Sequence, residues 1–183
     1  MLILLAILVI AAVLIPIFYI NRIIILSNRI DNAWSQIDVQ LKKRADLVPN
    51  LVETVKGYMK HEKKAIEMVT KAREEMLKAD ENIKAREKAE AELSKALKTI
   101  FALAENYPKL KASENFKMLQ EQLESIENKI AYARQFYNDA VLEYNNLTTT
   151  IPGKWFVGLS GKQKTREYFQ IGEVERSPVK VEF

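Results

Sequence analysis

Apolar residues fill the first 20 positions of the chain without a charged side chain, and helical periodicity follows. A membrane-spanning helix needs about 20 apolar residues at ~1.5 Å rise each, which residues 2–20 provide. Residues 23–26 extend the run beyond Arg22, and Pro16 is tolerated near the end of such a helix. A signal peptide would show a basic start and a small-residue cleavage site, and core helices rarely lack charge this long. We therefore predict an uncleaved transmembrane anchor at residues 1–26.

The most regular later pattern lies between residues 113 and 147. Its apolar positions alternate three and four residues apart: Phe116, Leu119, Leu123, Ile126, Ile130, Ala133, Tyr137, Ala140, Tyr144 and Leu147. This repeat of 3.5 residues predicts one long helix with a narrow seam that faces partner helices. Ser113 is a suitable N-cap, and Glu114 complements the helix dipole.

Three other segments carry shorter apolar stripes. The stripes are Ile30, Trp34, Ile37, Leu41 and Val48; Val52, Val55, Met59, Ile66, Val69 and Met76; and Leu93, Leu97, Ile100, Ala104 and Tyr107. We expect the first to continue directly from the anchor, Pro49 to mark a kink or break, and Asp80 or Asn82 to form a turn. Such stripes are buried by packing on one another, which predicts an all-α fold. We expect an antiparallel bundle of about four long helices over residues 27–150, with an extended C-terminal tail.

The C-terminal residues 151–183 follow no helical period. The stretch IPGKWFVGL at 151–159 is apolar and punctuated by glycine, and Val179, Val181 and Phe183 alternate with charged residues. Extended structure packed on the bundle is the interpretation we favour. A second places Trp155 and Phe156 at the bilayer interface, where amphipathic aromatic residues collect. A third is a partner-binding loop.

The net charge of the chain lies next to the anchor. Residues 21–64 hold nine Lys/Arg and five Asp/Glu, a net of +4, whereas residues 65–183 hold 19 of each. Cationic residues concentrate on the cytoplasmic flank of a spanning helix, which predicts a single-pass cell-membrane protein with its N-terminus outside and its soluble domain cytoplasmic. We expect membrane or partner contacts at Arg22, Arg29, Lys42, Lys43, Arg44, Trp155 and Phe156.

Candidate chemistry is sparse. The chain has no cysteine and one histidine, His61, and the pair His61–Glu62 does not continue as H-E-x-x-H because Ala65 follows. We find no phosphate-binding loop, dinucleotide fingerprint or nucleophile elbow, and the small basic excess lacks the aromatic interleaving of nucleic-acid binders. We therefore expect no catalytic residue, metal site or cofactor, and no nucleic-acid partner.

Several polar residues lie near the predicted apolar stripes. They are Asp38, Arg44, Glu62, Arg73, Arg134 and Asn138. A hydrogen-bonded network between helices, which fixes the register of the bundle, is the interpretation we favour. A recognition or switching site is the alternative.

Long motifs in the chain resemble those of the LemA family. They are NRIDNAWSQIDVQLKKRADLVPNLV at 28–52, VKGY at 55–58, AENYPKLKA at 104–112, ENKI at 127–130, YNDAV at 137–141 and the closing VEF. The match covers nearly everything after the anchor, and the one departure is Lys43, where the family more often has Arg. The resemblance implies a membrane helix followed by a long-helix bundle in a bacterial protein, without a defined activity. Some members are found beside membrane metalloproteases, and others are linked to internal membrane organelles.

These observations predict a membrane-anchored, non-catalytic scaffold or adaptor that forms oligomers. Its expected partners are membrane lipid, further copies of itself, and a membrane metalloprotease or another membrane protein. A membrane-remodelling, coat-like assembly is the alternative, motivated by the basic segment and the apolar C-terminal stretch. A metal-binding or enzymatic role would rest on His61 and Glu62 alone.

Overall fold

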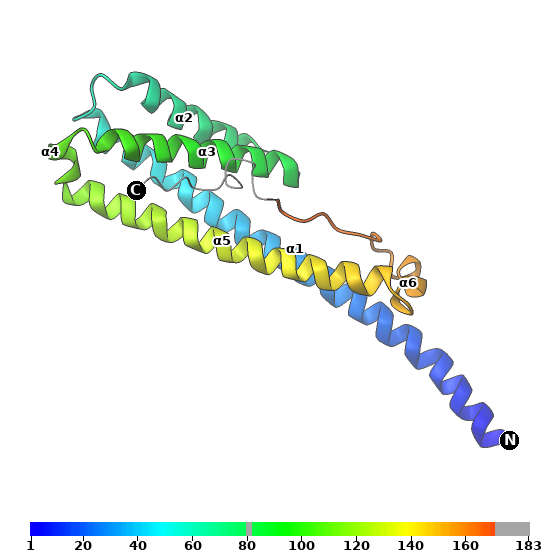
Figure 1. Cartoon of the computed structure of the whole chain (residues 1–183). Coiled ribbons are helices and arrows are strands. Elements are labelled where there is room, and N and C mark those ends of the chain that lie inside the picture. The colour runs from blue at the N-terminus through cyan, green and yellow to red at the C-terminus, as the bar shows by residue number, and fades with distance from the viewer. Residues whose placement is uncertain (80–81, 171–183) are drawn as a thin grey trace, which may run out of the picture. The chain divides into compact units, whose positions relative to one another are not determined.

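A computed structural model of the chain describes residues 1–79 and 82–170 (Figure 1). The elements are α1 (Leu2–Lys56), α2 (Lys63–Lys78), α3 (Ile83–Ala104), α4 (Pro108–Lys111), α5 (Glu114–Thr149), α6 (Gly153–Phe156) and the 3-10 helix η1 (Gly158–Ser160). The described residues contain no strand, and four of the helices are long, which confirms the predicted all-α class and helix number. The expectations for Asp80 and for Val179, Val181 and Phe183 fall outside the described residues.

The chain divides into two compact units, which are described separately. Unit 1 comprises Met1–Gln36 and Ala133–Tyr168, and unit 2 comprises Ile37–Tyr132 with Phe169 and Gln170 among the described residues. Helices α1 and α5 contribute to both units. The domain boundaries predicted at residues 26 and 150 stay predictions.

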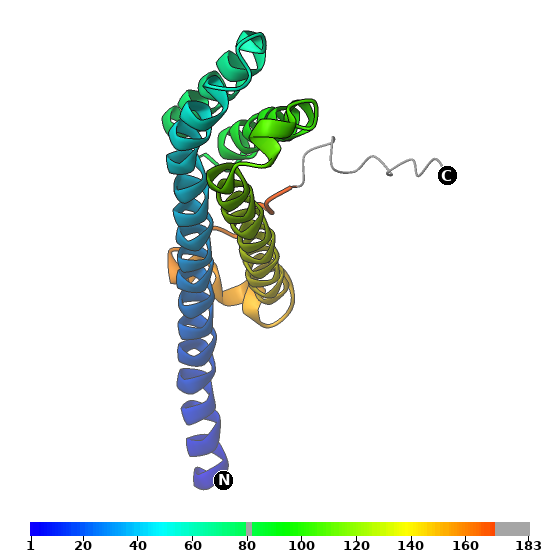
Figure 2. The same cartoon turned by 90° about the vertical axis from the view of Figure 1, so that its left-hand side faces the viewer.

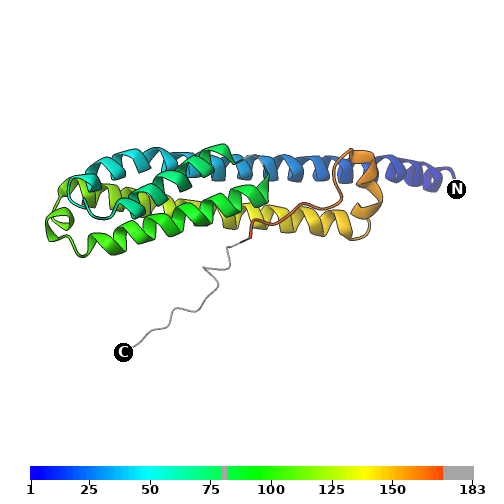
Figure 3. The same ribbon diagram turned by 90° about the horizontal axis from the view of Figure 1, so that it is seen from above.

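Unit 1 is built on the pairing of α1 with the second half of α5, which run side by side (Figure 3). On these two helices its buried residues are Ile23, Leu26, Ser27, Ile30 and Ala33 from α1, and Arg134, Tyr137, Ala140, Val141, Tyr144 and Thr148 from α5. The three- and four-residue spacing on α1 gives one continuous apolar stripe. Ile23 and Leu26, which the sequence analysis assigned to the anchor, therefore belong to the packed part of α1.

Unit 2 contains the α2–α3 hairpin together with parts of α1 and α5. Helix α2 lies along α3 (Figure 1), and α4 connects α3 to α5 at the end that faces the viewer in Figure 2. The side chain of Asn82 caps α3 by accepting a hydrogen bond from the backbone N–H of Lys84 at 2.9 Å. Asn82, one of the two residues predicted to form the turn, is thus the N-cap of α3.

The seam predicted on α5 is confirmed. Eight of its ten residues are buried, and Ala133 and Leu147 are half-buried. The stripe predicted on α3 is buried at Leu93, Leu97, Ile100 and Ala104, and half-buried at Tyr107. Because the chain's own helices cover the α5 seam, that seam is not a surface left over for partners.

Of the kink or break predicted at Pro49, the break is wrong, because α1 continues through it to Lys56 and ends before Gly57. A kink at Pro49 stays a prediction. A proline inside a helix removes one hydrogen bond and costs about 3 kcal/mol. The neighbouring Val48 and Leu51 are both fully buried, and burial of each such side chain contributes about 1.5–3 kcal/mol. Packing on both sides of Pro49 therefore offsets the lost bond.

The extended structure favoured at 151–159 is also wrong, because α6 and η1 make most of this stretch helical. The close approach of the chain at Gly153 explains this difference. A Cβ atom there would lie 2.1 Å from the carbonyl oxygen of Leu147. Glycine thus lets the chain turn back tightly against the end of α5 and begin a new helical turn.

Candidate functional site

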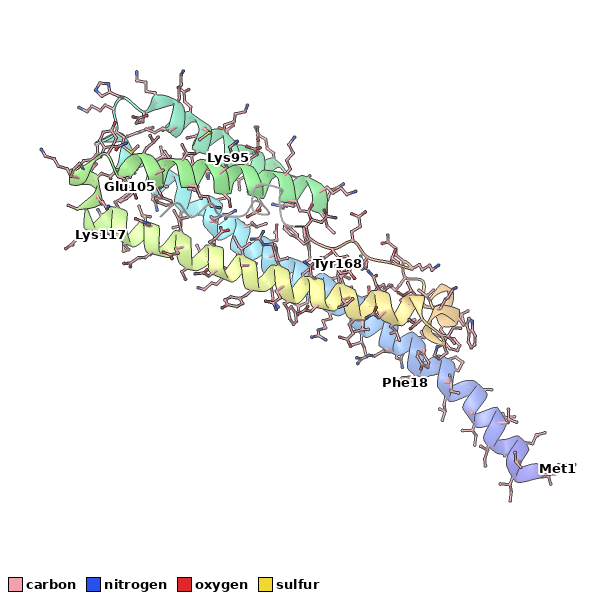
Figure 4. The ribbon with its side chains drawn as sticks, viewed as in Figure 1. Met1, Phe18, Lys95, Glu105, Lys117 and Tyr168 are labelled. Atoms are coloured by element: carbon pink, nitrogen blue, oxygen red, sulfur yellow. The ribbon has the colours of Figure 1, made fainter. Side chains whose placement is uncertain are left out.

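Residues 2–18 of α1 form an apolar helix with almost no cover from the rest of unit 1. Every residue from Leu2 to Phe18 is exposed except Ala11 and Pro16, which are half-buried. Figure 4 shows α1 between Met1 and Phe18 with side chains on all sides and no other segment beside its outer part. Among the described residues, α1 is the one helix that is long and apolar enough to cross a membrane.

The first charges after this stretch are paired with one carboxylate. Arg22 and Arg29 of α1 both bond Glu143 of α5, and the Arg29 Nη1 to Glu143 Oε2 distance is 2.9 Å. The Arg29 guanidinium also lies 5.1 Å from the ring centroid of Phe136. All three charged side chains are more than a third exposed, so each pair contributes little to stability. Arg22, Arg29 and Glu143 together carry one net positive charge just after the apolar stretch.

The α6–η1 turn lies beside this end of the apolar stretch of α1. The rings of Tyr19 and Phe156 stack with their centroids 5.6 Å apart and 19° between their planes. Trp155 is 65% exposed and Phe156 half-buried, so of these two predicted contact residues Trp155 is the more accessible.

A strap at residues 161–168 runs back along unit 1 after η1. Asn145 holds it by two hydrogen bonds with Arg166, since its Nδ2 donates to the Arg166 carbonyl at 3.0 Å and its Oδ1 accepts from the Arg166 N–H at 2.8 Å. The hydroxyl of Tyr137 donates to the Glu167 carbonyl at 3.0 Å, and that of Tyr144 to the Gln163 carbonyl.

The strap is also fixed to α1. Arg166 Nη2 donates to Ser27 Oγ and to Asp31 Oδ1, each at 3.0 Å. Burial raises the pKa of Tyr144, nearby Arg166 lowers it and Asp31 raises it, with a net increase. The sequence analysis missed Asn145 and Arg166. Asn145 adjoins the seam residue Tyr144, but no pattern in the strap itself pointed to its course.

In unit 2 the most buried charge is Arg44. Its Nη2 lies 3.1 Å from Glu90 Oε1, and its Nη1 donates to Ser94 Oγ at 3.0 Å and to Glu127. Ser94 in turn donates to Glu90 at 3.2 Å. One guanidinium thus joins α1, α3 and α5 and faces two carboxylates. Arg44, which was expected to contact the membrane or a partner, is 1% exposed and its side chain is bonded within unit 2.

An open cleft of about 390 Å³ adjoins Arg44. Its lining includes Ser94, Phe101, Gln120 and Glu127. Beside this cleft Arg44 is bonded to Glu90, Ser94 and Glu127, so the arrangement fixes three helices.

Two other predicted polar residues, Asp38 and Arg73, each bond a different helix. Arg86 Nη2 lies 2.9 Å from Asp38 Oδ1, and Arg73 Nε donates to the Ala45 carbonyl at 2.9 Å. These contacts join α1 to α3 and to α2. They support a role in helix register rather than in chemistry.

Glu62 accepts a hydrogen bond from the Tyr107 hydroxyl at 3.2 Å, which links the turn before α2 to the start of α4. Burial, the hydrogen bond and the charge of Glu62 raise the pKa of Tyr107. Arg134 is buried and Asn138 half-buried in unit 1. One network that joins all six predicted residues stays a prediction.

The remaining predicted residues lie at the surface. Lys42 and Lys43 are exposed on α1, and His61 is exposed in the turn between α1 and α2. Across residues 1–79 and 82–170, no three His, Cys, Asp or Glu side chains gather as a metal site would require. Sequence reasoning missed Glu90, Glu127 and Glu143, although Glu90 is one helical turn before Leu93 and Glu127 one turn after Leu123.

Comparison with known proteins gives a family and two relatives. The model of the LemA family matches residues 33–183. Magnetosome proteins MamQ 1 and MamQ 2 of Paramagnetospirillum magneticum (strain ATCC 700264 / AMB-1) are each 29% identical over 91 residues, which cover 50% of this chain and 33% of the relative. The chain thus aligns with about a third of the length of the curated relatives it matches.

Proposed function

We propose a membrane-anchored, non-catalytic scaffold function for this chain, which belongs to the LemA family. The observation that carries the proposal is α1 itself. Its first part exposes an unbroken apolar surface, and its later residues form the core of a helical bundle. One continuous helix thereby joins the proposed bilayer anchor to packed helices of the same chain.

The anchor proposal rests on the cost of the alternative. In a soluble protein the exposed side chains from Leu2 to Phe18 would all face water. This exposure costs a free energy of about 25 cal/mol for each Å² of apolar surface. Helix formation satisfies the backbone groups internally, as a bilayer requires. Extraction of native membranes with alkaline carbonate tests this directly. Retention of the chain in the membrane pellet is expected, and its release would contradict the proposal.

We propose that the N-terminus faces outward and the bundle lies in the cytoplasm. The positive-inside bias acts within about 15–20 residues of a spanning helix. Arg22 and Arg29 fall in that range, whereas Lys42 and Lys43 lie more than 20 positions beyond Ile20. The orientation therefore rests on the two arginines.

The absence of cysteine from the sequence allows a clean orientation experiment. Single cysteines are introduced as Leu2→Cys at the anchor start and Lys117→Cys on the exposed face of α5, and intact cells receive a membrane-impermeant maleimide. Labelling of the Leu2→Cys chain alone is expected, with Lys117→Cys labelled after permeabilisation. The reverse pattern would contradict the orientation.

The bonding of the charged groups in unit 2 supports a non-catalytic role. Arg44 is bonded to both Glu90 and Glu127, and Glu62 is bonded to Tyr107. An enzymatic or metal-binding role would rest on His61, which is exposed. Metal analysis of the purified chain and of its His61→Ala variant distinguishes a metal-binding role from the non-catalytic role. A stoichiometric metal that the variant lacks would contradict the proposal.

The proposed partners are further copies of the chain and other membrane proteins, a membrane metalloprotease among them. Exposed apolar side chains outside the anchor, such as Tyr132 on α5, support protein contacts. Cross-linking in native membranes followed by mass spectrometry is the test. Cross-links between copies or to other membrane proteins are expected, and recovery of uncross-linked monomer alone would count against scaffolding.

Membrane remodelling is a second candidate, favoured by the apolar side chains that α6 and η1 expose beside the anchor. Overexpression followed by electron tomography distinguishes it from scaffolding. Curved or internal membranes would support remodelling, and unchanged membranes would leave the scaffold as the single proposal.

A further inference from the structure

The segment 151–160 exposes three large apolar side chains close together in sequence. Ile151 is 68%, Trp155 65% and Leu159 71% exposed. Packing of Gly153 against the end of α5 and the strap at 161–168 hold this segment on unit 1. From this geometry we infer that 151–160 is a second membrane contact, which lies in the headgroup region of a bilayer rich in anionic lipid.

The position of the anchor supports this inference. Residues 2–19 span about 27 Å of helix at 1.5 Å per residue, close to the ~30 Å hydrocarbon thickness. Tyr19 therefore lies where the helix leaves the hydrocarbon, and Phe156 stacks on Tyr19. The region of α1 around Phe18, labelled in Figure 4, is beside α6. The α6–η1 turn is thus at the depth where tryptophan collects in membranes.

Charge around the segment identifies the lipid class. Residues 150–166 contain Lys154, Lys162, Lys164 and Arg166 and no Asp or Glu. Arg166 bonds Asp31, which leaves three lysines as the basic rim. Anionic headgroups attract such a rim within a Debye length of about 8–10 Å.

A bilayer fits this surface better than a second copy of the chain. The exposed side chains of 151–160 continue the exposed apolar surface of residues 2–18, through the Tyr19–Phe156 stack. Two copies that met through this segment would bring two basic rims together, which is repulsive. The inference rests on the proposed anchor, because the anchor sets the depth of the turn.

Tryptophan fluorescence of the full chain in nanodiscs tests the inference. The chain has two tryptophans, and Trp34→Phe leaves Trp155 as the single probe, whereas Trp155→Phe leaves Trp34 as the matched control. Trp34 packs on Tyr137 with ring centroids 5.7 Å apart, and circular dichroism verifies that both variants keep their helices. The probes are phosphatidylcholine brominated at carbons 6 and 7, and aqueous acrylamide.

Strong quenching of Trp155 by brominated lipid and weak quenching by acrylamide are expected, with no lipid quenching of Trp34. Strong acrylamide quenching of Trp155 without lipid quenching would overturn the inference. Protection of Trp155 from both quenchers would overturn it in favour of a protein neighbour. In discs that contain phosphatidylglycerol, Lys154→Gln with Lys162→Gln and Lys164→Gln should reduce the lipid quenching. An unchanged value would overturn the choice of anionic lipid.

Failure of the anchor is distinguishable from failure of this contact. Release of the chain by alkaline carbonate would contradict the proposed anchor. If the chain stays in the membrane but Trp155 is quenched by aqueous acrylamide and not by brominated lipid, the second contact alone is contradicted.

Discussion

The guanidinium of Arg44 and the carboxylate of Glu90 lie 3.1 Å apart, and their side chains are 1% and 4% exposed. Removal of one partner from a buried pair leaves an unpaired charge and costs about 3–5 kcal/mol. We predict a loss of this size in the free energy of unfolding for Arg44→Ala, measured by denaturant titration of helical circular dichroism in detergent micelles.

Lys43→Ala is the matched control, because Lys43 is the exposed neighbour of Arg44 on the same helix. Surface substitutions of this kind usually stay within about 0.5 kcal/mol. Equal unfolding free energies for the two variants would show that the Arg44 cluster does not hold unit 2 together.

Gly153 gives a second prediction. A Cβ at this position would meet the Leu147 carbonyl oxygen at 2.1 Å, whereas nothing lies within 4 Å of a Cβ at Gly158. Gly153→Ala should weaken the docking of α6 by about 1–3 kcal/mol, as overpacking does. Hydrogen exchange of residues 150–160, read by mass spectrometry, should become faster in this variant and stay unchanged in Gly158→Ala. Unchanged exchange in both would contradict the close approach.

The strap gives a third prediction through Asn145. Asn145→Ala removes two hydrogen bonds to the Arg166 backbone, each worth about 1 kcal/mol. Exchange of the strap amides should accelerate about tenfold or more relative to the parent chain. Asn146→Ala is the control, since Asn146 is exposed on the next position of α5. A strap that stays equally protected in Asn145→Ala would be held by other contacts.

The raised pKa of Tyr144 predicts a loss of stability at high pH. In the unfolded chain the phenol ionises near its ordinary value of about 10, whereas the folded chain still holds the proton. Tyr144 therefore contributes its full stabilisation below about pH 10, and this contribution falls as pH rises through the folded pKa.

Tyr144→Phe isolates that contribution. Above about pH 10, the unfolding free energy of the parent chain should fall more steeply with pH than that of the variant. At neutral pH the variant should lose about 1 kcal/mol, because the bond to the Gln163 carbonyl is absent. Parallel pH profiles would contradict the raised pKa.

The long helices were predictable because their apolar residues repeat over many turns. The seam from Phe116 to Leu147 fixed one face of α5, and burial confirms that face. Pro49 misled the prediction, since a local rule about proline was outweighed by packing at Val48 and Leu51. The helix ends instead at Lys56, directly before Gly57. Glycine is unfavourable inside a helix by about 0.5–1 kcal/mol relative to alanine, so a helix end there costs little.

The partners of the polar residues were harder to predict than their burial. Arg44 was recognised as a polar residue on an apolar stripe, but Glu90 and Ser94 lie about 50 positions later in the chain. Such pairing depends on how α1 and α3 meet, which no local pattern specifies. The same holds for Asn145 and Arg166, whose contact joins a helix to a segment without periodicity.

The scaffold proposal is tested most directly by the mass of the particle that contains the chain in its native membrane. Native mass spectrometry of polymer-extracted nanodiscs, made without detergent, gives that mass. We predict multiples of the 21.1 kDa chain, or one chain bound to another membrane protein. A population that consists of the 21.1 kDa monomer alone would contradict the scaffold function.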